Sequence, residues 1–446
     1  MLISYSIQPF IFIFSLFLFY NLTLCSENEE PFLYKRSPDY LINNHYFEIP
    51  PAKDSFSLNE VQVINYPDDY TLKQLHLLSR HGSRYPNLDQ ITHFDKIDKA
   101  FANVSVAKEW PKNPFPTEKQ NHLTTRGKLE SYYNGLQCRK RYEKFWKNVE
   151  YDADVVKFQT GDSFWVSQSA MAFTEGLLDG TGPVGACKNE PAYIWSLPAK
   201  QDTILTIYLA CKRWNMTVSN NFTYFTEQTY SYGNETLAPL AEKLTKKYDI
   251  NPPLDPLLIP YMYYYCDFWV GVFKRSDTWC ELLSDDELIL ARYPWNMKNY
   301  FVYSYGHPFN ELMGCAYITQ FVNSVENYLS GNSRMIADLK YTQGFPMSLI
   351  LTTLGVYKNK YPITANLTLE QMKSLKYIET KVLHWTSTIY FEIYTSPGRD
   401  ALLRLVVDYE PYIIPGCDGE YCKWTKFKNI FGDKINCDFE KMCAYP

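Results

Sequence analysis

Two arginines flank a histidine in the segment RHGSRYP, residues 80–86. A guanidinium group carries a planar fork of donors that can bind two phosphate oxygens at once, and its charge stabilises the negative charge that spreads over a phosphoryl group during transfer. An imidazole between two such groups can attack phosphorus and form a covalent phosphohistidine. We therefore predict that His81 is a catalytic nucleophile and that Arg80 and Arg84 bind phosphate.

The alternative interpretation of this segment is a basic turn with one exposed histidine. The five fixed positions R-H-G-x-R-x-P would arise by chance on the order of once in several thousand chains of this length, with residue types taken as equally frequent. The pattern resembles the signature of the histidine acid phosphatases, a family that includes phytases and multiple inositol polyphosphate phosphatases. The resemblance extends over roughly residues 60–446, and residues 266–280 (CDFWVGVFKRSDTWC) are similar to the inositol polyphosphate branch.

The resemblance implies a two-step phosphomonoesterase that works in acid conditions without a metal or organic cofactor. Its substrate would be a phosphorylated small molecule such as an inositol polyphosphate. The formal net charge of −5 argues against a nucleic-acid partner and provides no overall field that would attract a polyanion. Any basic pocket must therefore be local, and the sequence identifies no protein partner.

The first departure from the family pattern is the loss of an arginine. In the family, a third arginine opens a segment of the form R-V-x-x-S-A-x-x-F-x-x-G. Residues 165–176 read WVSQSAMAFTEG, so Trp165 occupies the arginine position. Tryptophan offers one donor and no charge, and the loss of one preorganised donor typically costs about a hundred- to a thousandfold in rate.

The second departure lies in a late strand-loop-helix corner, where the family has His-Asp or His-Ala-Glu. Here the corner reads Gln343-Gly344-Phe345. Gln343 can still donate a hydrogen bond to phosphate, but neither of the next two residues can protonate a leaving alcohol, a step worth roughly a hundred- to ten-thousandfold. We predict strongly impaired activity; the alternative is an inactive pseudophosphatase that binds a phosphorylated ligand or a protein partner.

Two residues elsewhere are candidates to replace the missing groups. His307 precedes a proline and Asp338 lies in a late apolar run, and each is more simply explained as structural. His76 and His384 lie in apolar stretches, which is typical of buried structural histidines.

The hydrophobic pattern predicts the elements that position these residues. Strand-like apolar runs occur at residues 72–78, 153–158, 334–339, 387–394 and 401–409. Helical patterns occur at 128–149 and 167–178, and at 347–354 after a proline that suits a helix start. His81 and Gln343 each follow a strand, and the carboxyl ends of strands in open α/β sheets are common ligand sites.

We therefore expect an α/β fold, with a mixed or mainly parallel sheet flanked by helices and an inserted, mainly helical domain. Residues 61–90, 150–180 and 300–446 are assigned to the α/β domain. Residues 91–149 and 181–299 are assigned to the helical domain.

The amino terminus predicts export. Residues 1–25 hold an apolar block that is short for a membrane span and typical of a signal peptide, and residues 26–60 predict a polar N-terminal arm. Eleven cysteines less Cys25 leave ten, an even number that suits disulfides, and Cys417 and Cys422 predict a local one. Glycosylation sequons occur at Asn103, Asn215, Asn221, Asn234 and Asn366. We expect a secreted or luminal protein with no membrane span.

Overall fold

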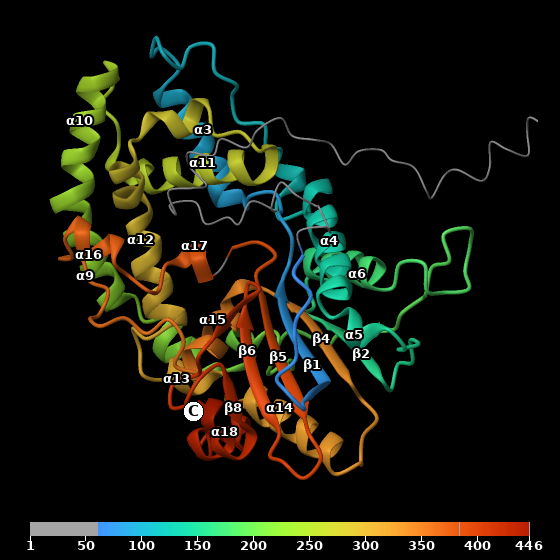
Figure 1. Ribbon diagram of the computed structural model, residues 1–446. Coiled ribbons are helices and arrows are strands. Elements are labelled where there is room, and N and C mark those ends of the chain that lie inside the picture. Colours follow the sequence, from blue (N-terminus) through green and yellow to red (C-terminus); the bar gives the residue numbers. More distant parts are fainter. Residues whose placement is uncertain (1–60, 383, 446) are drawn as a thin grey trace, which may run out of the picture.

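The computed structural model describes residues 61–382 and 384–445. A mixed sheet lies between helices, and further helices gather beyond one end of the strands (Figure 1). The expected α/β fold class is confirmed. The predicted signal peptide, residues 1–25, and the predicted arm, residues 26–60, lie outside the described residues.

The sheet has eight strands in the order β3-β2-β4-β1-β5-β6-β7, with β8 also paired to β6. The strands are β1 (Thr71–Arg80), β2 (Val156–Thr160), β3 (Ile194–Trp195), β4 (Ala337–Thr342), β5 (Thr388–Thr395), β6 (Leu402–Val407), β7 (Glu410–Tyr412) and β8 (Tyr421–Lys423). Strands β1 to β4 run parallel, and β5 pairs antiparallel to β1. The carboxyl ends of β1 and β4 therefore meet at one edge, directly before His81 and Gln343.

The α-helices are α3 (Leu88–Ala100), α4 (Thr125–Arg141), α5 (Glu143–Trp146), α6 (Phe164–Leu177), α7 (Ile207–Ala210), α8 (Lys212–Trp214), α9 (Phe222–Tyr232), α10 (Ala238–Tyr248), α11 (Ile259–Phe273), α12 (Asp285–Tyr303), α13 (Asn310–Met313), α14 (Cys315–Leu329), α15 (Gly344–Thr353), α16 (Leu369–Lys373), α17 (Glu379–Val382), α18 (Trp424–Ile430) and α19 (Phe439–Cys443). All predicted strands are present, with ends moved by up to three residues. The helix predicted at 128–149 breaks at Tyr142, whose backbone is not helical.

Alternating side chains of the central strands fill two cores. Leu75, Leu77 and Tyr390 face the core beneath α4 and α6, whereas Leu78 and Phe391 face the core beneath α14 and α15. All five are fully buried, and burying one such side chain stabilises the fold by about 1.5–3 kcal/mol. Helix α4 comes from the segment expected in the helical domain, but it packs on α6 and over the sheet instead.

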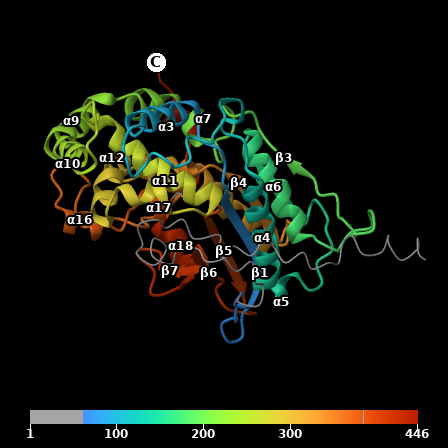
Figure 2. The ribbon, with the colours of Figure 1, turned by 90° about the horizontal axis from the view of Figure 1, so that it is seen from above.

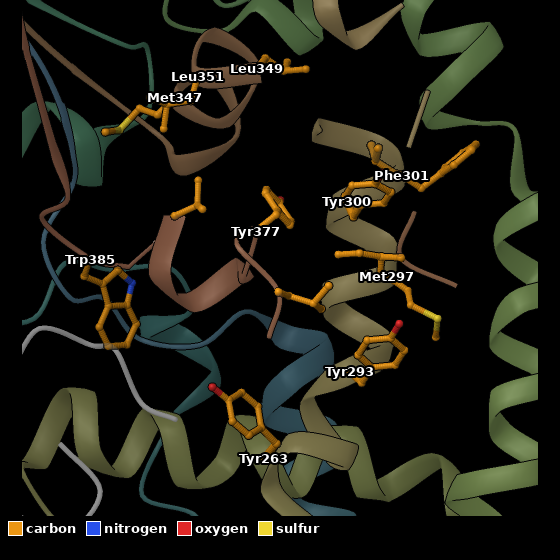
Figure 3. Packing of buried hydrophobic residues seen from close by; sticks show 14 of the residues in the cluster. Tyr263, Tyr293, Met297, Tyr300, Phe301, Met347, Leu349, Leu351, Tyr377 and Trp385 are labelled. Carbon is orange, nitrogen blue, oxygen red and sulfur yellow. The ribbon is translucent and has the colours of Figure 1, made fainter. Parts of the chain in front are cut away.

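The helical part gathers α3, α10, α11 and α12 on the side away from α4 and α6 (Figure 2). Its core continues into the α/β part, because Tyr263 of α11 and Tyr293 and Phe301 of α12 belong to the same buried cluster as Met347 of α15 (Figure 3). One continuous core therefore fixes α11 and α12 relative to the carboxyl edge of the sheet.

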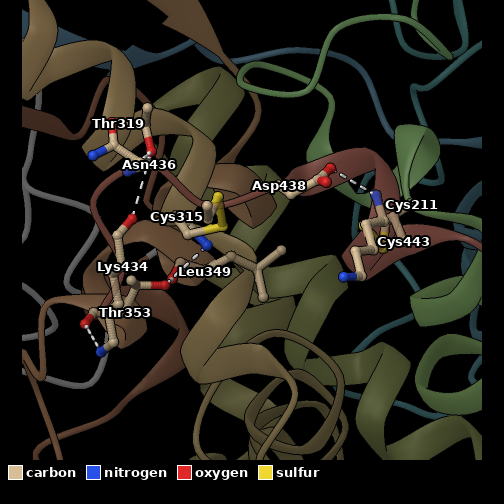
Figure 4. Close-up of a disulfide and its surroundings, with 12 residues drawn as sticks. Cys211, Cys315, Thr319, Leu349, Thr353, Lys434, Asn436, Asp438 and Cys443 are labelled. Carbon is tan, nitrogen blue, oxygen red and sulfur yellow. Dashed lines mark hydrogen bonds between the residues drawn. A yellow bond between two sulfur atoms is a disulfide. The ribbon is translucent and has the colours of Figure 1, made fainter. Parts of the chain in front are cut away.

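Disulfides tie the C-terminal tail to the helices. Cys211–Cys443 and Cys315–Cys437 link the tail to the α7–α8 junction and to α14 (Figure 4). The predicted Cys417–Cys422 bridge is confirmed, Cys266 pairs with Cys280, and Cys187 is also disulfide-bonded. The even number of cysteines suggested that all of them form disulfides. Cys138 is an exception, because it is a free thiol in the core beneath α4. Burial raises the pKa of Cys138 to about 12, which keeps the thiol protonated and unreactive.

Candidate active site

The loop after β1 is held between its two neighbouring strands. The backbone N–H of His81 donates to the Thr342 carbonyl at the end of β4 (3.1 Å), and the N–H of Thr386 donates to the His81 carbonyl (3.1 Å). The N–H of Arg80 donates to the carbonyl of Ser387 (2.9 Å). His81 is therefore fixed by main-chain hydrogen bonds on both sides.

Helices α4 and α6 support the same loop from below. The N–H of Gly82 donates to Ser169 Oγ (3.1 Å), and the N–H of Ser83 donates to Glu130 Oε2 (2.8 Å). Gly82 also lies so close to α4 that a Cβ atom there would stand 2.1 Å from the carbonyl oxygen of Gly127. The glycine that follows His81 is thus required by close backbone packing.

We expect Gly82→Ala to lower the free energy of unfolding by about 1–3 kcal/mol, because the new methyl group overlaps rigid backbone. A displaced His81 should also lower activity by about a hundredfold. Chemical denaturation and phosphate release would measure the two effects. The matched control is Gly233→Ala, since Gly233 has φ −58° and open space around its Cβ position. Equal stability of the two variants would contradict the packing argument.

The hydrogen bonding of His81 defines which of its ring nitrogens keeps a free lone pair. Its Nδ1 lies 2.8 Å from the carbonyl oxygen of Gly82, which can only accept, so Nδ1 carries the proton. Nε2 is then left with its lone pair. Burial lowers the pKa of His81 well below its usual range, and the charges of Arg80 and Arg84 lower it further. The lowered pKa favours the neutral ring, whose free lone pair could attack an electrophile.

The two arginines keep donors available for a ligand. Arg80 Nε is buried and has no hydrogen-bond partner among the described residues. Arg84 Nη1 donates to the Tyr85 carbonyl (2.8 Å) and to Asn121 Oδ1 (2.7 Å), which fixes the direction of its side chain. Burial lowers the pKa of both arginines to about 10, so both stay charged in acidic and neutral solution.

A cavity of about 360 Å³ brings the predicted site residues together. Arg80, His81, Arg84 and Gln343 all line it, so the two strand ends converge as the sequence indicated. The rest of the wall comes from α3, α11, α12, α15 and the segment around α17. It consists of Asn87, Asp89, Gln90, Tyr261, Tyr264, Asp267, Phe268, Trp295, Lys298, Asn299, Gly344, Phe345, Glu379, Thr380, His384 and Trp385.

The corner after β4 contributes polar atoms but no acid. Gln343 Nε2 lies 3.4 Å from Ser163 Oγ, and the ring of Phe345 stacks on Tyr303 with centroids 4.1 Å apart. Gly344 and Phe345 open α15, and the positive end of a helix dipole favours an anion at such a position. This corner can therefore help to bind phosphate, but its side chains cannot donate a proton from an acid group.

Three residues singled out in the sequence lie elsewhere. Trp165 of α6 is not among the described residues that line the cavity, and its Nε1 is buried without a hydrogen-bond partner among them. His307 Nδ1 accepts from the N–H of Phe309 (3.2 Å), as a turn residue does. Asp338 pairs with Lys340 inside the sheet and lies 3.8 Å from His76. Neither His307 nor Asp338 replaces the missing groups of the cavity.

His384 is a buried histidine in the cavity wall. Its Nδ1 donates to the Trp385 carbonyl (2.9 Å) and its Nε2 donates to Asp408 Oδ2 (2.8 Å), so both ring nitrogens carry protons. Burial opposes the charge, but Asp408 and the carbonyl outweigh burial and raise the pKa of His384. The prediction that His384 is buried and satisfied is confirmed, and its charge adds to that of the arginines.

The sequence interpretation missed two carboxyl groups in the cavity wall. Asp267 comes from the middle of α11 and Glu379 begins α17. Asp267 Oδ1 and Glu379 Oε2 are buried, and neither has a hydrogen-bond partner within the described part of the chain. An available signal was the position of Asp267 in the otherwise apolar and aromatic run YMYYYCDFWVGVF, because acids are seldom buried without a reason.

Residues 61–382 and 384–445 contain no group of three or more His, Cys, Asp or Glu side chains that could hold a metal ion. The cavity wall itself supplies several groups that could take part in chemistry. These are an uncharged imidazole beside cationic donors, a helix N-terminus and two buried carboxyl groups.

Comparison with known proteins gives a consistent result. The model of the histidine phosphatase superfamily (branch 2) matches residues 71–408. Multiple inositol polyphosphate phosphatase 1 of Dictyostelium discoideum is 21% identical over 431 residues, which cover 83% of this chain and 67% of that protein. A phytase of Candida albicans is 22% identical over 404 residues, which cover 85% of this chain and 82% of that protein.

Solved structures share the fold. The phytase from D. castellii superposes with a TM-score of 0.69 at 16% identity, covering 88% of this chain and 87% of that chain. The multiple inositol polyphosphate phosphatase of Bifidobacterium longum, in complex with inositol hexasulfate, gives a TM-score of 0.64 at 11% identity, covering 85% of this chain and 96% of that chain.

Proposed function

The chain belongs to the histidine phosphatase superfamily (branch 2), and on that premise we propose that it hydrolyses phosphate monoesters through a phosphohistidine at His81. The observation that carries the proposal is the state of His81: a neutral ring whose Nδ1 is held by a carbonyl, in a cavity with two charged arginines. A phosphate dianion bound by Arg80 and Arg84 would face the lone pair of Nε2.

The first step follows from this arrangement. The Nε2 lone pair attacks phosphorus, the bond to the ester oxygen breaks, and the phosphoryl group is transferred to His81. The arginines and the N-terminus of α15 stabilise the charge on the equatorial oxygens. Water then attacks phosphorus in the second step, and the electron pair of the P–N bond returns to Nε2.

We propose a slow enzyme compared with relatives that keep the full family pattern. Phe345 stacks on Tyr303 and supplies no proton, and a tryptophan stands at the position of the third arginine.

The same observations favour a second candidate function, a pseudophosphatase that binds a phosphorylated ligand without hydrolysing it. Phosphate release from an aryl phosphate, scanned from acidic to neutral pH, separates the two candidates. Ligand binding without any release would support the second.

The cavity predicts which monoesters are preferred. Asp89 and Glu379 face the same space as Arg80, Arg84 and Lys298, so two carboxylates offset part of the positive charge. The aromatic rings of Tyr261 and Tyr264 each contact the ring of Trp295 in the cavity wall. Such a wall suits a substrate with one phosphate and a planar group. Inositol polyphosphates, which appear in the names of the relatives, carry more negative charge than this cavity can balance.

We therefore expect kcat/KM to be at least about tenfold higher for an aryl monophosphate than for inositol hexakisphosphate, since unbalanced like charges disfavour binding of the latter. Measurements at equal pH and ionic strength with both substrates would check this. An inositol bisphosphate serves as an intermediate case. A preference for the hexakisphosphate would contradict the charge argument.

We further propose that the protein is secreted or luminal. Four disulfides connect described cysteines, as is common in oxidising compartments. Within the described residues, no helix has both the length and the apolar character needed to cross a membrane. Of the sequon asparagines, Asn103, Asn221, Asn234 and Asn366 are exposed to solvent, where glycosylation would be accommodated.

A further inference from the structure

The proposed reaction leaves the source of one proton open. When the ester bond breaks, the leaving alkoxide needs a proton unless the alcohol is itself acidic. The corner at Gln343 to Phe345 has no acidic side chain, and His307 and Asp338 do not line the cavity. His81 cannot supply this proton, because its Nε2 takes part in the attack and its Nδ1–H points to Gly82.

Asp267 meets the geometric requirements for a proton donor. It lines the same cavity as His81 and Arg80, and its Oδ1 is buried with no hydrogen-bond partner in the described chain. Helix α11 holds it firmly, because the neighbouring Cys266 is bridged to Cys280 and the Val270 carbonyl accepts from Arg126 Nη1 (3.1 Å) on α4. A fixed carboxyl group without a structural partner is free to interact with a ligand.

Glu379 lies in the same wall and differs from Asp267 in its contacts. The hydroxyl of Tyr264 donates to Glu379 Oε1 (3.3 Å), which favours the ionised form of this carboxyl. Burial raises the pKa of Glu379, but the positive charges of Arg80, Arg292 and Lys298 oppose the rise. Glu379 is therefore the better site for the negative charge of the pair, and Asp267 is the better site for a proton.

The groups that face Asp267 come from three neighbouring elements: Arg80 of β1, Arg292 of α12 and Glu379 of α17. Burial and the charge of Glu379 raise the pKa of Asp267 to about 7, although Arg80 and Arg292 oppose the rise. A raised pKa means that Asp267 keeps its proton throughout the acidic range and loses it as the pH rises through about 7.

We infer that Asp267 is the general acid of this site, in place of the acid that the corner after β4 lacks, and that Glu379 is a positioning residue that keeps the proton on Asp267. In the first step the proton of the Asp267 carboxyl passes to the ester oxygen as the P–O bond breaks. In the second step water attacks phosphorus, its proton passes to the Asp267 carboxylate, and the P–N bond breaks. One alcohol and one phosphate leave, and both residues return to their starting states.

This inference rests on the proposed phosphohistidine reaction, so its test compares leaving groups. Dinitrophenolate leaves without a proton, whereas an alkoxide needs one. We expect Asp267→Asn to lose about a hundredfold or more in kcat on an alkyl phosphate, and less than about tenfold on 2,4-dinitrophenyl phosphate. Asp89→Asn removes another carboxyl group of the cavity wall, is the matched control and should change both substrates by the same factor.

Two further measurements keep the inference testable if Asp267→Asn folds poorly. In the unmodified protein, the ratio of alkyl to dinitrophenyl turnover should fall as the pH rises through about 7. Glu379→Gln should move this fall to lower pH, because the negative charge that retains the proton is gone. A purely structural role for either residue would leave the pH of the fall unchanged.

The outcomes distinguish the two proposals. If the unmodified protein releases no phosphate from dinitrophenyl phosphate, the phosphohistidine reaction itself is wrong. If it turns over this substrate, but Asp267→Asn loses the same factor on both leaving groups, the general-acid role is overturned and the reaction stands. A loss confined to the alkyl substrate supports Asp267.

Discussion

His81→Ala reduces phosphate release from every monoester by at least about a thousandfold, because His384, the other histidine of the described cavity lining, has both ring nitrogens engaged in hydrogen bonds. The prediction depends on the isolation of His81: its ring is nearly fully buried, and the two arginines beside it have no nucleophilic lone pair. The steady-state rate of phosphate release from 2,4-dinitrophenyl phosphate measures the effect, because this substrate needs no general acid.

The matched control is His307→Ala, which also removes an imidazole. His307 is partly exposed in a turn and lies outside the cavity lining, so this variant should keep its rate within about twofold. Binding of inorganic phosphate should survive in His81→Ala, since the arginines and the start of α15 remain. Residual turnover within tenfold of the unmodified protein would show that phosphate is released by direct attack of water.

Arg80→Met lowers kcat/KM by about a hundred- to a thousandfold, the cost of removing a preorganised donor from a charged intermediate. The variant has a second effect, because Arg80 is one of the two cations that oppose the rise in the pKa of Asp267. Without Arg80 the pKa of Asp267 rises, so the activity that depends on its proton persists to higher pH. A pH profile of kcat/KM on an alkyl phosphate measures both effects together.

Arg399→Met is the control for Arg80→Met. Arg399 is exposed and pairs with Asp69 at the surface (3.2 Å), so its loss should change kcat/KM by less than about twofold at any pH. A normal rate with Arg80→Met would show that Arg80 does not contribute to phosphate binding. A reduced rate with an unchanged pH profile would show that Arg80 does not influence the pKa of Asp267.

The sequence predicted the sheet and the convergence of its strand ends because short-range patterns specify both. Apolar runs marked β1 and β4, and the motif at residues 80–86 fell on the loop after β1. Parallel pairing of these strands then places His81 next to Gln343, a consequence that needs no detailed packing. The strand ends moved by a few residues because main-chain pairing, rather than hydrophobicity, sets them.

The carboxyl pair could not be predicted in the same way. Asp267 and Glu379 are far apart in the chain, and only the packing of α11 and α17 around the cavity brings them together. Comparison with the family pattern predicted the absence of an acid at Gly344 and Phe345, but the substitutes it suggested were His307 and Asp338, which are not among the described residues that line the cavity. Trp165 is a related case, since a side chain at the position of the lost arginine packs away from the cavity.

The central claim is that His81 carries the phosphoryl group, and rapid acid-free quenching of the protein with 2,4-dinitrophenyl phosphate tests it most directly. We expect a peptide containing residues 80–86 to gain the mass of one phosphoryl group, with the modification on His81 stable in base and labile in acid. The same peptide from His81→Ala should remain unmodified. Turnover of the substrate with no modified peptide at any quench time, or a phosphoryl group on another residue, would contradict the account.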